Sequence, residues 1–402
     1  MNVEIRTAGR DERLDALAPI WHYFGAATGP EEDRAQRILK VLPEGRMQVA
    51  VDGEAIVGGA GAFQFNLTVP GGSVRTAGVT VVGVLPSHRR RGILRELMRA
   101  QLDDIHARGE PLAALWASEA SIYRRYGYGM ASLCGDMDIP RTHADFVRPV
   151  ERPGSVRIVD REQALALCPP VYDRACAETP GMLARSRIWW EARVLDDPDW
   201  RRAGGGELSV AVLEDDDGPQ AYAVYRLNFA YDDGVPTGAV VVLEAIGATA
   251  EAEIAIWRYL LDIDWMARIE ASLLPLDHPL LLLAAEPGRL RFRVGDGIFL
   301  RLVDVGAALA ARSFAGDDSL VLQVADTFCP WNDACFTVRG QKTMEEPDLR
   351  LPVDTLASAY LGGFTFHQLA RVGRVEEVSG GALARADALF RSDRAPWCPE
   401  IF

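Results

Sequence analysis

The residues with the clearest chemical potential lie at positions 82–95, which read V-G-V-L-P-S-H-R-R-R-G-I-L-R. An apolar strand runs here into a short turn that contains Gly92, and a helix begins at that point. The first N–H groups of a helix lack internal partners and lie at the positive end of its dipole, so they form an anion site. Gly92 lets the backbone approach a phosphate closely, and Arg89, Arg90 and Arg91 add positive charge. The stretch therefore predicts a polyphosphate site.

The alternative is a solvated basic patch in which Gly92 serves only the turn. The stretch is neither a P-loop nor a dinucleotide fingerprint, because it contains no Gly-Lys-Ser/Thr and no G-x-G-x-x-G. Gly83, inside the apolar strand, indicates either a bulge or a ligand lying close to that backbone. The strand, turn, helix and following strand together favour the anion site.

The elements that must position this loop follow from periodicity and turn residues. The predicted strands are Met47–Val51, Ala55–Phe65, Ala77–Val84 and Leu112–Ala117. Helices are predicted over Leu14–Phe24, Gln36–Leu42, Ile93–Ile105 and Glu119–Tyr126. The order strand, strand, strand, helix, strand, helix predicts an α/β domain with at least one parallel crossover pair.

The same order recurs further along the chain, which favours a distant internal duplication. The second set comprises strands Glu207–Leu213, Ala221–Asn228, Ala239–Ile246 and Glu270–Leu274, with a helix over Glu251–Ile263. Pro140–Val156, with three prolines, is the candidate linker between the two sets. The final segment has strands Phe299–Val303 and Leu320–Val324 and helices Thr355–Leu361 and Ala382–Phe390.

Composition narrows the class of protein. The chain has 402 residues, 49% of them apolar and 25% charged, which excludes general disorder. Its formal charge of −14 disfavours sequence-independent binding to nucleic acid or to an anionic membrane. No apolar run is long enough for a transmembrane helix. The six Cys and six His are scattered without metal-ligand spacing, so we expect no metal, no disulfide framework and a cytoplasmic location.

Two sequence stretches resemble a known family. R-R-R-G-I-L after an apolar strand resembles the Arg/Gln-x-x-Gly-x-Gly/Ala loop with which the GNAT superfamily grips the pyrophosphate of acetyl-CoA, with Leu94 in place of the usual Gly or Ala. More narrowly, this loop together with A-S-E-A-S-I-Y-R-R-Y-G-Y-G at 117–129 resembles the Eis-type aminoglycoside and polyamine N-acetyltransferases. The resemblance covers essentially the whole chain and includes a C-terminal phenylalanine.

The resemblance implies a multidomain protein of α/β and α+β type. We expect a GNAT domain over 1–148 that binds acetyl-CoA as the acyl donor, and a degenerate GNAT-like domain over 149–290. A sterol-carrier-protein-like domain over 291–402 would end in the active site. No R-x-x-G loop leads directly into the predicted helix at Glu251, which agrees with degeneracy. Assembly as a homo-hexamer is also implied by the resemblance.

The resemblance also assigns roles to residues. The backbone of Val82, Gly83 and Val84 would pair with the pantetheine amides as an added strand would. The loop that would hold the pyrophosphate consists of Arg90, Arg91, Gly92, Ile93, Leu94 and Arg95. Ser118 and Glu119 would line the thioester side.

Two further groups match the family's catalytic pair. Tyr123 matches the general acid that protonates the departing CoA thiolate, and the carboxylate of Phe402 matches the general base. A terminal carboxylate with a pKa of about 3.5 is a weak base, so it would orient the amine or act through water. The apolar, proline-containing ending at 396–402 is unlike a frayed tail.

On the acceptor side, Phe24 matches an aromatic residue of the family's pocket. Ala26 stands where well-known members have an Asp, and Trp116 replaces a smaller residue, so the shape and charge of the pocket differ. Glu400 would keep the mouth acidic, which suits a polyamine or a lysine side chain. The predicted function is direct acetyl transfer from acetyl-CoA to a primary amine of a polycationic small molecule. The alternatives are a non-catalytic acyl-CoA or lipid sensor and a protein lysine acetyltransferase.

Overall fold

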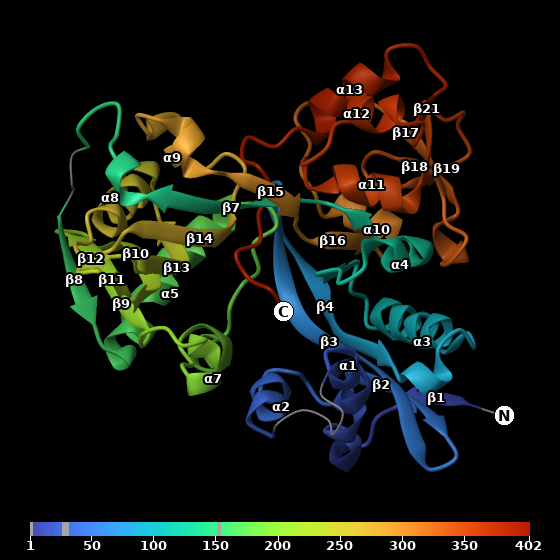
Figure 1. The fold of residues 1–402 in the computed structure, drawn as a ribbon. Helices are drawn as coiled ribbons and strands as arrows, with labels where there is room; N and C mark the ends of the chain where they lie inside the picture. Colours follow the sequence, from blue (N-terminus) through green and yellow to red (C-terminus); the bar gives the residue numbers. More distant parts are fainter. Residues whose placement is uncertain (1–2, 26–31, 151–153) are drawn as a thin grey trace. The chain divides into compact units, whose positions relative to one another are not determined.

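The computed structural model describes residues 3–25, 32–150 and 154–402 (Figure 1). Ala26 and part of the predicted linker, 151–153, therefore lie outside the described residues. The chain divides into two compact units. Unit 1 comprises Met1–Ser132, Ile298–Asp393 and Ile401–Phe402, and unit 2 comprises Leu133–Gly297 and Arg394–Glu400.

Unit 1 is built on a seven-stranded sheet in the order β1-β2-β3-β4-β5-β16-β6. The strands are β1 Glu4–Thr7, β2 Met47–Asp52, β3 Ala55–Val69, β4 Gly72–Val84, β5 Leu112–Leu115, β6 Gly129–Met130 and β16 Phe299–Leu302. All neighbours are antiparallel except β4 and β5, which run parallel through the crossover helix α3 (Ile93–Ala107). This is the parallel crossover pair that the sequence predicts.

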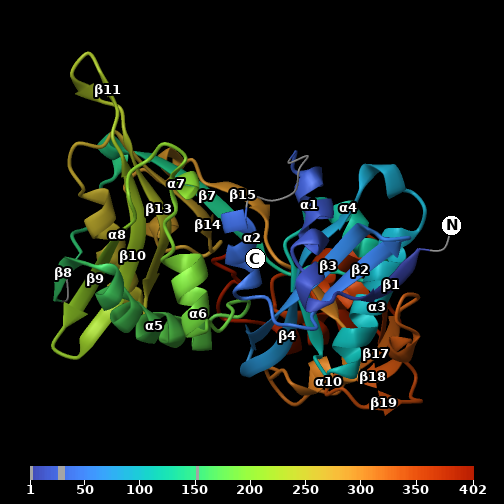
Figure 2. The same ribbon diagram turned by 90° about the horizontal axis from the view of Figure 1, so that it is seen from below.

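Helices cover both faces of this sheet (Figure 2). On one face, α3 buries Ile93, Leu97, Met98, Leu102 and Ile105, the apolar positions of its helical repeat. On the other face lies α1 (Ala18–Tyr23), whose first turn contains Pro19. Two glycines allow this segment to approach the sheet closely. A Cβ on Gly59 would meet the carbonyl of Ala16, just before α1, at 2.3 Å, and one on Gly83 would meet the nitrogen of Ile20 in α1 at 2.7 Å.

Unit 2 repeats the plan of unit 1. Its seven-stranded sheet has the order β15-β7-β14-β13-β10-β9-β8, which read from β8 matches the order read from β1 in unit 1. The strands are β7 Leu133–Pro140, β8 Ser155–Val159, β9 Ser209–Asp215, β10 Gly218–Asn228, β13 Ala239–Gly247, β14 Arg268–Leu274 and β15 Arg293–Asp296. The parallel pair is β13 and β14, and α8 (Ala250–Leu261) links them. The predicted duplication is thus visible in the topology.

Four further helices lie in the described part of unit 2, whose two apolar cores lie on opposite faces of the sheet. They are α5 Arg161–Glu178, α6 Arg187–Trp189, α7 Asp199–Arg202 and α9 Leu280–Leu283. A small hairpin, β11 Tyr231–Asp232 and β12 Val235–Pro236, projects from the strand ends.

Each large sheet contains a strand from a distant part of the chain. β16 lies between β5 and β6 in unit 1, although it follows Leu133–Gly297 of unit 2 in sequence. In unit 2, β7 pairs with β14 in the equivalent position, although β7 comes directly after Met1–Ser132 of unit 1. Sequence analysis did not predict either placement.

The C-terminal part of unit 1 has its own five-stranded sheet in the order β19-β18-β17-β20-β21. Its strands are β17 Val321–Ala325, β18 Ala334–Thr337, β19 Lys342–Thr343, β20 Leu349–Pro352 and β21 Glu376–Glu377. The accompanying helices are α10 Val305–Ala310, α11 Val353–Tyr360, α12 Phe366–Arg371 and α13 Ala382–Phe390. This α+β layout agrees with the predicted fold class.

The N-terminal region differs most from the predicted elements. The expected helix over Leu14–Phe24 is a 3-10 turn, Asp15–Leu17, followed by the six-residue α1, because Pro19 starts a new helical turn. The next helix, α2, spans Glu32–Leu39 rather than Gln36–Leu42. In the described parts of the chain, none of the helices is both long enough and apolar enough to span a bilayer.

Candidate active site

The parallel strands β4 and β5 separate in the middle of the first sheet. Their pairing covers Thr76–Gly78 with Leu112–Ala114 and stops there among the described residues, although β4 continues to Val84. The register with β3 shifts at the same level, and Val81 has a φ of +48°. Such a bulge twists one strand away from its neighbour. The far half of β4 therefore has one edge free for another extended group.

A cavity of about 770 Å³ opens at this split, entirely within unit 1. It runs from the end of β4 and the N-terminus of α3 to the short helix α4 (Ala120–Tyr123). The residues that line it are Ile20, Tyr23, Val82, Gly83, Val84, His88, Arg89, Arg90, Gly92, Ile93, Leu94, Arg95, Ser118, Glu119, Ile122, Tyr123, Arg125, Tyr126, Thr327 and Phe328.

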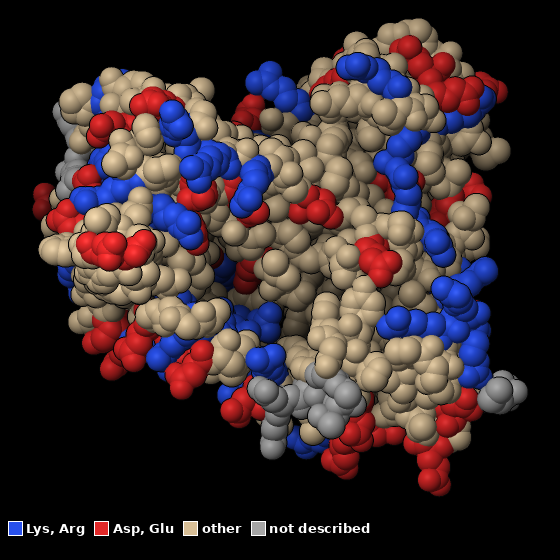
Figure 3. Space-filling model, in the orientation of Figure 1, with Lys and Arg blue, Asp and Glu red and all other residues tan. Residues whose placement is uncertain are grey.

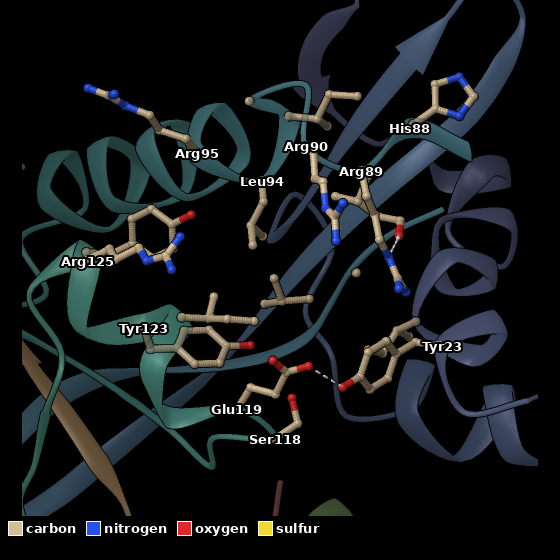
Figure 4. A pocket seen from close by; sticks show the side chains of 18 of the residues that line it. Tyr23, His88, Arg89, Arg90, Leu94, Arg95, Ser118, Glu119, Tyr123 and Arg125 are labelled. Carbon is tan, nitrogen blue, oxygen red and sulfur yellow. Dashed lines mark hydrogen bonds between the residues drawn. The ribbon is translucent and has the colours of Figure 1, made fainter. Parts of the chain in front are cut away.

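One end of the cavity is suited to a polyphosphate. Gly92 precedes α3 with a φ of +84°, and Arg90 also adopts a left-handed conformation at +60°. Figure 4 shows Arg89 and Arg90 extending from the loop toward the cavity, whereas His88 and Arg95 extend away from it. Lys and Arg side chains also gather on the surface around α3 (Figure 3). Backbone N–H groups of a helix start and guanidinium groups thus face the same space.

The opposite end carries three tyrosines and one carboxylate. The phenol of Tyr23 donates a hydrogen bond to Glu119 Oε1, with 2.7 Å between the oxygens, and this bond raises the pKa of Tyr23 (Figure 4). Tyr123 is only 8% exposed, and burial raises its pKa to about 12, with smaller contributions from Tyr126, Tyr23 and Glu119. The ring of Tyr123 packs edge-on against Tyr128, with 6.0 Å between their centroids. Tyr123 is therefore a protonated donor at neutral pH.

The structure brings most of the predicted site residues together. All of Val82, Gly83, Val84, Arg90, Gly92, Ile93, Leu94, Arg95, Ser118, Glu119 and Tyr123 line the cavity. Arg91 differs from the prediction, because its guanidinium lies 3.5 Å from Asp52 on β2 and it does not line the cavity. Gly83 serves a purpose that the prediction did not include, since its lack of a side chain admits the backbone of α1.

The predicted acceptor-side residues are not part of the cavity lining. Phe24 is 68% exposed and packs edge-on against Tyr23, and Trp116 is partly buried. Phe402 is 8% exposed, and its ring lies edge-on to Phe65 of β3 with 5.2 Å between centroids.

Glu400 differs from its predicted role at an acidic mouth. Its carboxylate accepts hydrogen bonds from Arg185 Nε, at 3.0 Å, and from the indole of Trp189. Both partners belong to unit 2, as Glu400 does, and Arg185 neutralises its charge. This carboxylate is engaged within the fold rather than directed at a substrate.

Sequence reasoning missed Tyr23, Arg125 and the pair Thr327 and Phe328. Ile20 and Tyr23 both line the cavity from α1, and their spacing of three residues is a helical-face signal that could have identified Tyr23. Thr327 and Phe328 come from the loop after β17. No local pattern connects that loop with residues 82–126.

Comparison with known proteins identifies the family. Residues 4–131 and 181–302 each match a family of acetyltransferase (GNAT) domains, and residues 305–399 match a sterol carrier protein domain. An uncharacterized N-acetyltransferase of Streptomyces avermitilis is 39% identical over the full length of both chains. The N-acetyltransferase Eis of Mycobacterium tuberculosis is 35% identical over 91% of each chain. The crystal structure of Eis1 from Mycobacterium abscessus superimposes over all of both chains with a TM-score of 0.85 and 34% identity.

The split sheet, its cationic loop and the family matches define a GNAT-superfamily acetyltransferase with two GNAT domains and a sterol-carrier-like domain. Within that class, the chain belongs to the Eis-type N-acetyltransferases. Its acyl donor is acetyl-CoA, and the residues present fit this donor. The free edge of β4 would pair with the amides of the pantetheine part, and the loop at Arg89–Gly92 would hold the pyrophosphate of CoA.

Proposed function

We propose that this enzyme acetylates a primary amine of a small polycationic acceptor, such as an aminoglycoside or a polyamine. The observation that carries the proposal is the charge distribution along the cavity. Arginines line the phosphate end, whereas Glu119 is the one carboxylate among the described residues that line the cavity. Glu119 lies beside Ser118 and Tyr123 at the other end, where the thioester would be. An ammonium group approaching the acetyl group would meet this carboxylate.

The proposed reaction is a direct transfer of the acetyl group from acetyl-CoA to the amine. The neutral amine attacks the thioester carbonyl, a C–N bond forms, the C–S bond breaks, and the amine loses one proton while the sulfur gains one. Tyr123 would donate a hydrogen bond to the leaving sulfur. A phenol with a pKa of about 12 would give its proton to a thiolate of pKa about 8.5 only at a cost of roughly 5 kcal/mol. Tyr123 thus stabilises the developing negative charge on sulfur chiefly through this hydrogen bond.

We further propose that the terminal carboxylate of Phe402 orients the amine or receives its proton through water. The buried ring supports this role, because a packed terminal residue holds its carboxylate in place. A frayed terminus would not do so.

The test is release of the CoA thiol from acetyl-CoA by protein with a native C-terminus. The acceptor panel contains aminoglycosides, polyamines, lysine peptides and uncharged arylalkylamines. We expect turnover with at least one polycation, at a kcat/KM at least tenfold above that for the uncharged amines. Exclusive turnover of lysine peptides would replace the proposal with protein acetylation. No turnover of any amine, with acetyl-CoA still bound, would contradict it altogether. The predicted homo-hexamer and cytoplasmic location stay predictions.

A further inference from the structure

The second sheet contains the same split as the first. β13 and β14 pair over Ala239–Val242 and Arg268–Ala271, after which β13 continues to Gly247 and β14 to Leu274. The register of β13 with β10 shifts at Leu243, just as that of β4 shifts against β3. In unit 1 the split opens into the acetyl-CoA cavity. In unit 2 a cavity of about 250 Å³ remains at the end of β13 and the start of α8, whereas the space between the diverging strands β13 and β14 is filled.

The chain's own C-terminal segment, Arg394–Glu400, fills it. The indole nitrogen of Trp397 donates a hydrogen bond to the carbonyl of Leu273 in β14, and its backbone nitrogen donates to Pro180 at 2.8 Å. Only about 10 Å³ remains free between the diverging strands and the side chains of Trp397 and Pro399. Trp397 occupies the part of this GNAT-like sheet where pantetheine would enter.

A buried charge cluster fixes the end of the segment. Arg185, with 1% of its side chain exposed, pairs with Glu244 of β13 at 2.5 Å and with Glu400 at 3.0 Å. Burial opposes the charge of Arg185, but Glu244 and Glu400 outweigh burial and hold its pKa well above the ordinary value. Because the three side chains are largely buried, removal of one partner would leave the others poorly compensated. The position of Glu400 is therefore specified by charge as well as by packing.

Unit 2 has also lost the means to hold a pyrophosphate. Only Ala248 and Thr249 separate β13 from α8, and neither is basic. The hydroxyl of Thr249 accepts a hydrogen bond from Ala252 N at 3.2 Å and caps the helix. The helix start thus satisfies part of its own hydrogen-bonding need.

We infer that the split in the second GNAT-like domain has become a socket for the chain's C-terminal segment, and that Trp397 and Glu400 are positioning residues for the terminal carboxylate. Phe402 follows Glu400 by two residues, so its Cα can lie no more than about 7 Å from that of Glu400. This inference rests on the proposed catalytic role of the carboxylate. It gives the degenerate domain a function that requires no cofactor.

The experiment measures how firmly the segment is docked and does not depend on enzyme activity. Cys398 is 2% exposed and lies beside Trp397, whereas Cys335 on β18 is partly exposed and serves as an internal reference. A thiol reagent and peptide mapping at pH 8 would give the labelling rate of each cysteine in the full-length enzyme. We expect Trp397→Ala to label at Cys398 at least tenfold faster than wild type, with no change at Cys335. The matched control is Trp265→Ala, which removes an exposed indole from the same unit.

Kinetics of the same variants test the positioning role. Trp397→Ala should lower kcat at least tenfold and leave the Kd of acetyl-CoA within twofold of wild type, while Trp265→Ala changes neither. Glu400→Gln keeps the shape of the side chain and should show smaller changes in Cys398 labelling and kcat in the same directions. This variant provides the test if Trp397→Ala does not fold. Unchanged labelling of Cys398 in the folded variants would overturn the socket. Faster labelling with an unchanged kcat would overturn the positioning role.

The two hypotheses can fail separately. If the wild-type enzyme acetylates no amine in the panel, the proposed function fails, and the labelling rates still decide whether the socket exists. If wild type is active and a C-terminal extension that converts the Phe402 carboxylate into a peptide bond leaves kcat unchanged, the carboxylate has no role, and the positioning inference falls with it.

Discussion

Tyr23 and Glu119 meet across the active-site cavity, with the phenol oxygen of Tyr23 2.7 Å from Glu119 Oε1. Tyr23 ends α1, and Glu119 precedes α4, so the bond connects two elements far apart in sequence. The guanidinium of Arg89 lies over the Tyr23 ring, 5.3 Å from its centroid. Tyr23 therefore stands between the arginines of the phosphate end and the carboxylate of the acceptor end.

The first prediction concerns this pair. Tyr23→Phe removes the hydrogen bond that orients Glu119, and it should raise the KM for the amine about three- to tenfold. Glu119→Gln, which removes the charge, should raise it by about tenfold or more. Steady-state kinetics with saturating acetyl-CoA would measure both values. Tyr231→Phe, at an exposed tyrosine of unit 2, is the control. An unchanged amine KM in Glu119→Gln would remove Glu119 from acceptor binding.

Tyr123→Phe is the second test. Loss of the donor to sulfur should lower kcat about 100-fold and leave acetyl-CoA binding unchanged. Because the pKa of Tyr123 is about 12, its phenol stays protonated through pH 10, and the wild-type rate should show no alkaline decline from this group below that pH. Tyr126→Phe, which alters a neighbouring phenol of the same cavity, is the matched control. Equal losses in the two variants would argue against a specific role for Tyr123.

A third prediction tests the contact between α1 and β4. A Cβ at position 83 would lie 2.7 Å from the nitrogen and 2.8 Å from the Cα of Ile20. Gly83→Ala should therefore push α1 away from the sheet and cost about 1–3 kcal/mol of unfolding free energy. Gly72→Ala, in the same strand but facing open space, should be nearly neutral. Urea unfolding would measure the difference, and equal stability of the two variants would contradict the close contact.

The fourth prediction is a pH effect in unit 2. His278 is 2% exposed, lies edge-on to Trp257, and accepts a hydrogen bond from Leu280 N at 3.3 Å. Burial lowers its pKa to about 3, whereas an unfolded histidine has a pKa near 6.5. The contribution of neutral His278 to the free energy of unfolding is fully present above pH 6.5 and is lost as the pH falls toward 3.

The measurement compares wild type with His278→Gln, which keeps a hydrogen-bond acceptor. Between pH 7.5 and pH 5 the wild type should lose about 2 kcal/mol more unfolding free energy than the variant. The comparison between the two proteins cancels the contributions of the other titrating groups. Parallel stability curves would show that His278 does not titrate on unfolding in this range.

The sequence predicted the cofactor half of the site well because that half is local. Strand β4, the loop at 85–92 and α3 are consecutive, and each carries its own signal in the form of small and β-branched residues, glycine, and a helical apolar repeat. Their proximity follows from chain connectivity. The ion pair of Arg91 was not predictable, because only the fold brings Asp52 of β2 beside this loop.

The acceptor half was less predictable. Phe24 and Tyr23 are neighbours in sequence, and the phase of a six-residue helix after Pro19 decides which of them faces the cavity. The ion pair that engages Glu400 depends on Arg185, more than two hundred residues earlier. Such contacts are set by the tertiary fold and leave no local pattern.

The long sequence separation between β5 and its neighbour β16 has a consequence for biosynthesis. Leu115 of β5 cannot reach its partner Phe299 until the ribosome has made nearly three quarters of the chain. At about 5–20 residues per second, the first sheet waits on the order of ten seconds or more with an unpaired edge. Unpaired edges invite association with other chains, so the nascent protein should depend on chaperones during this interval. A fragment that ends at the boundary of the first GNAT match, residue 131, would keep that edge permanently and should aggregate.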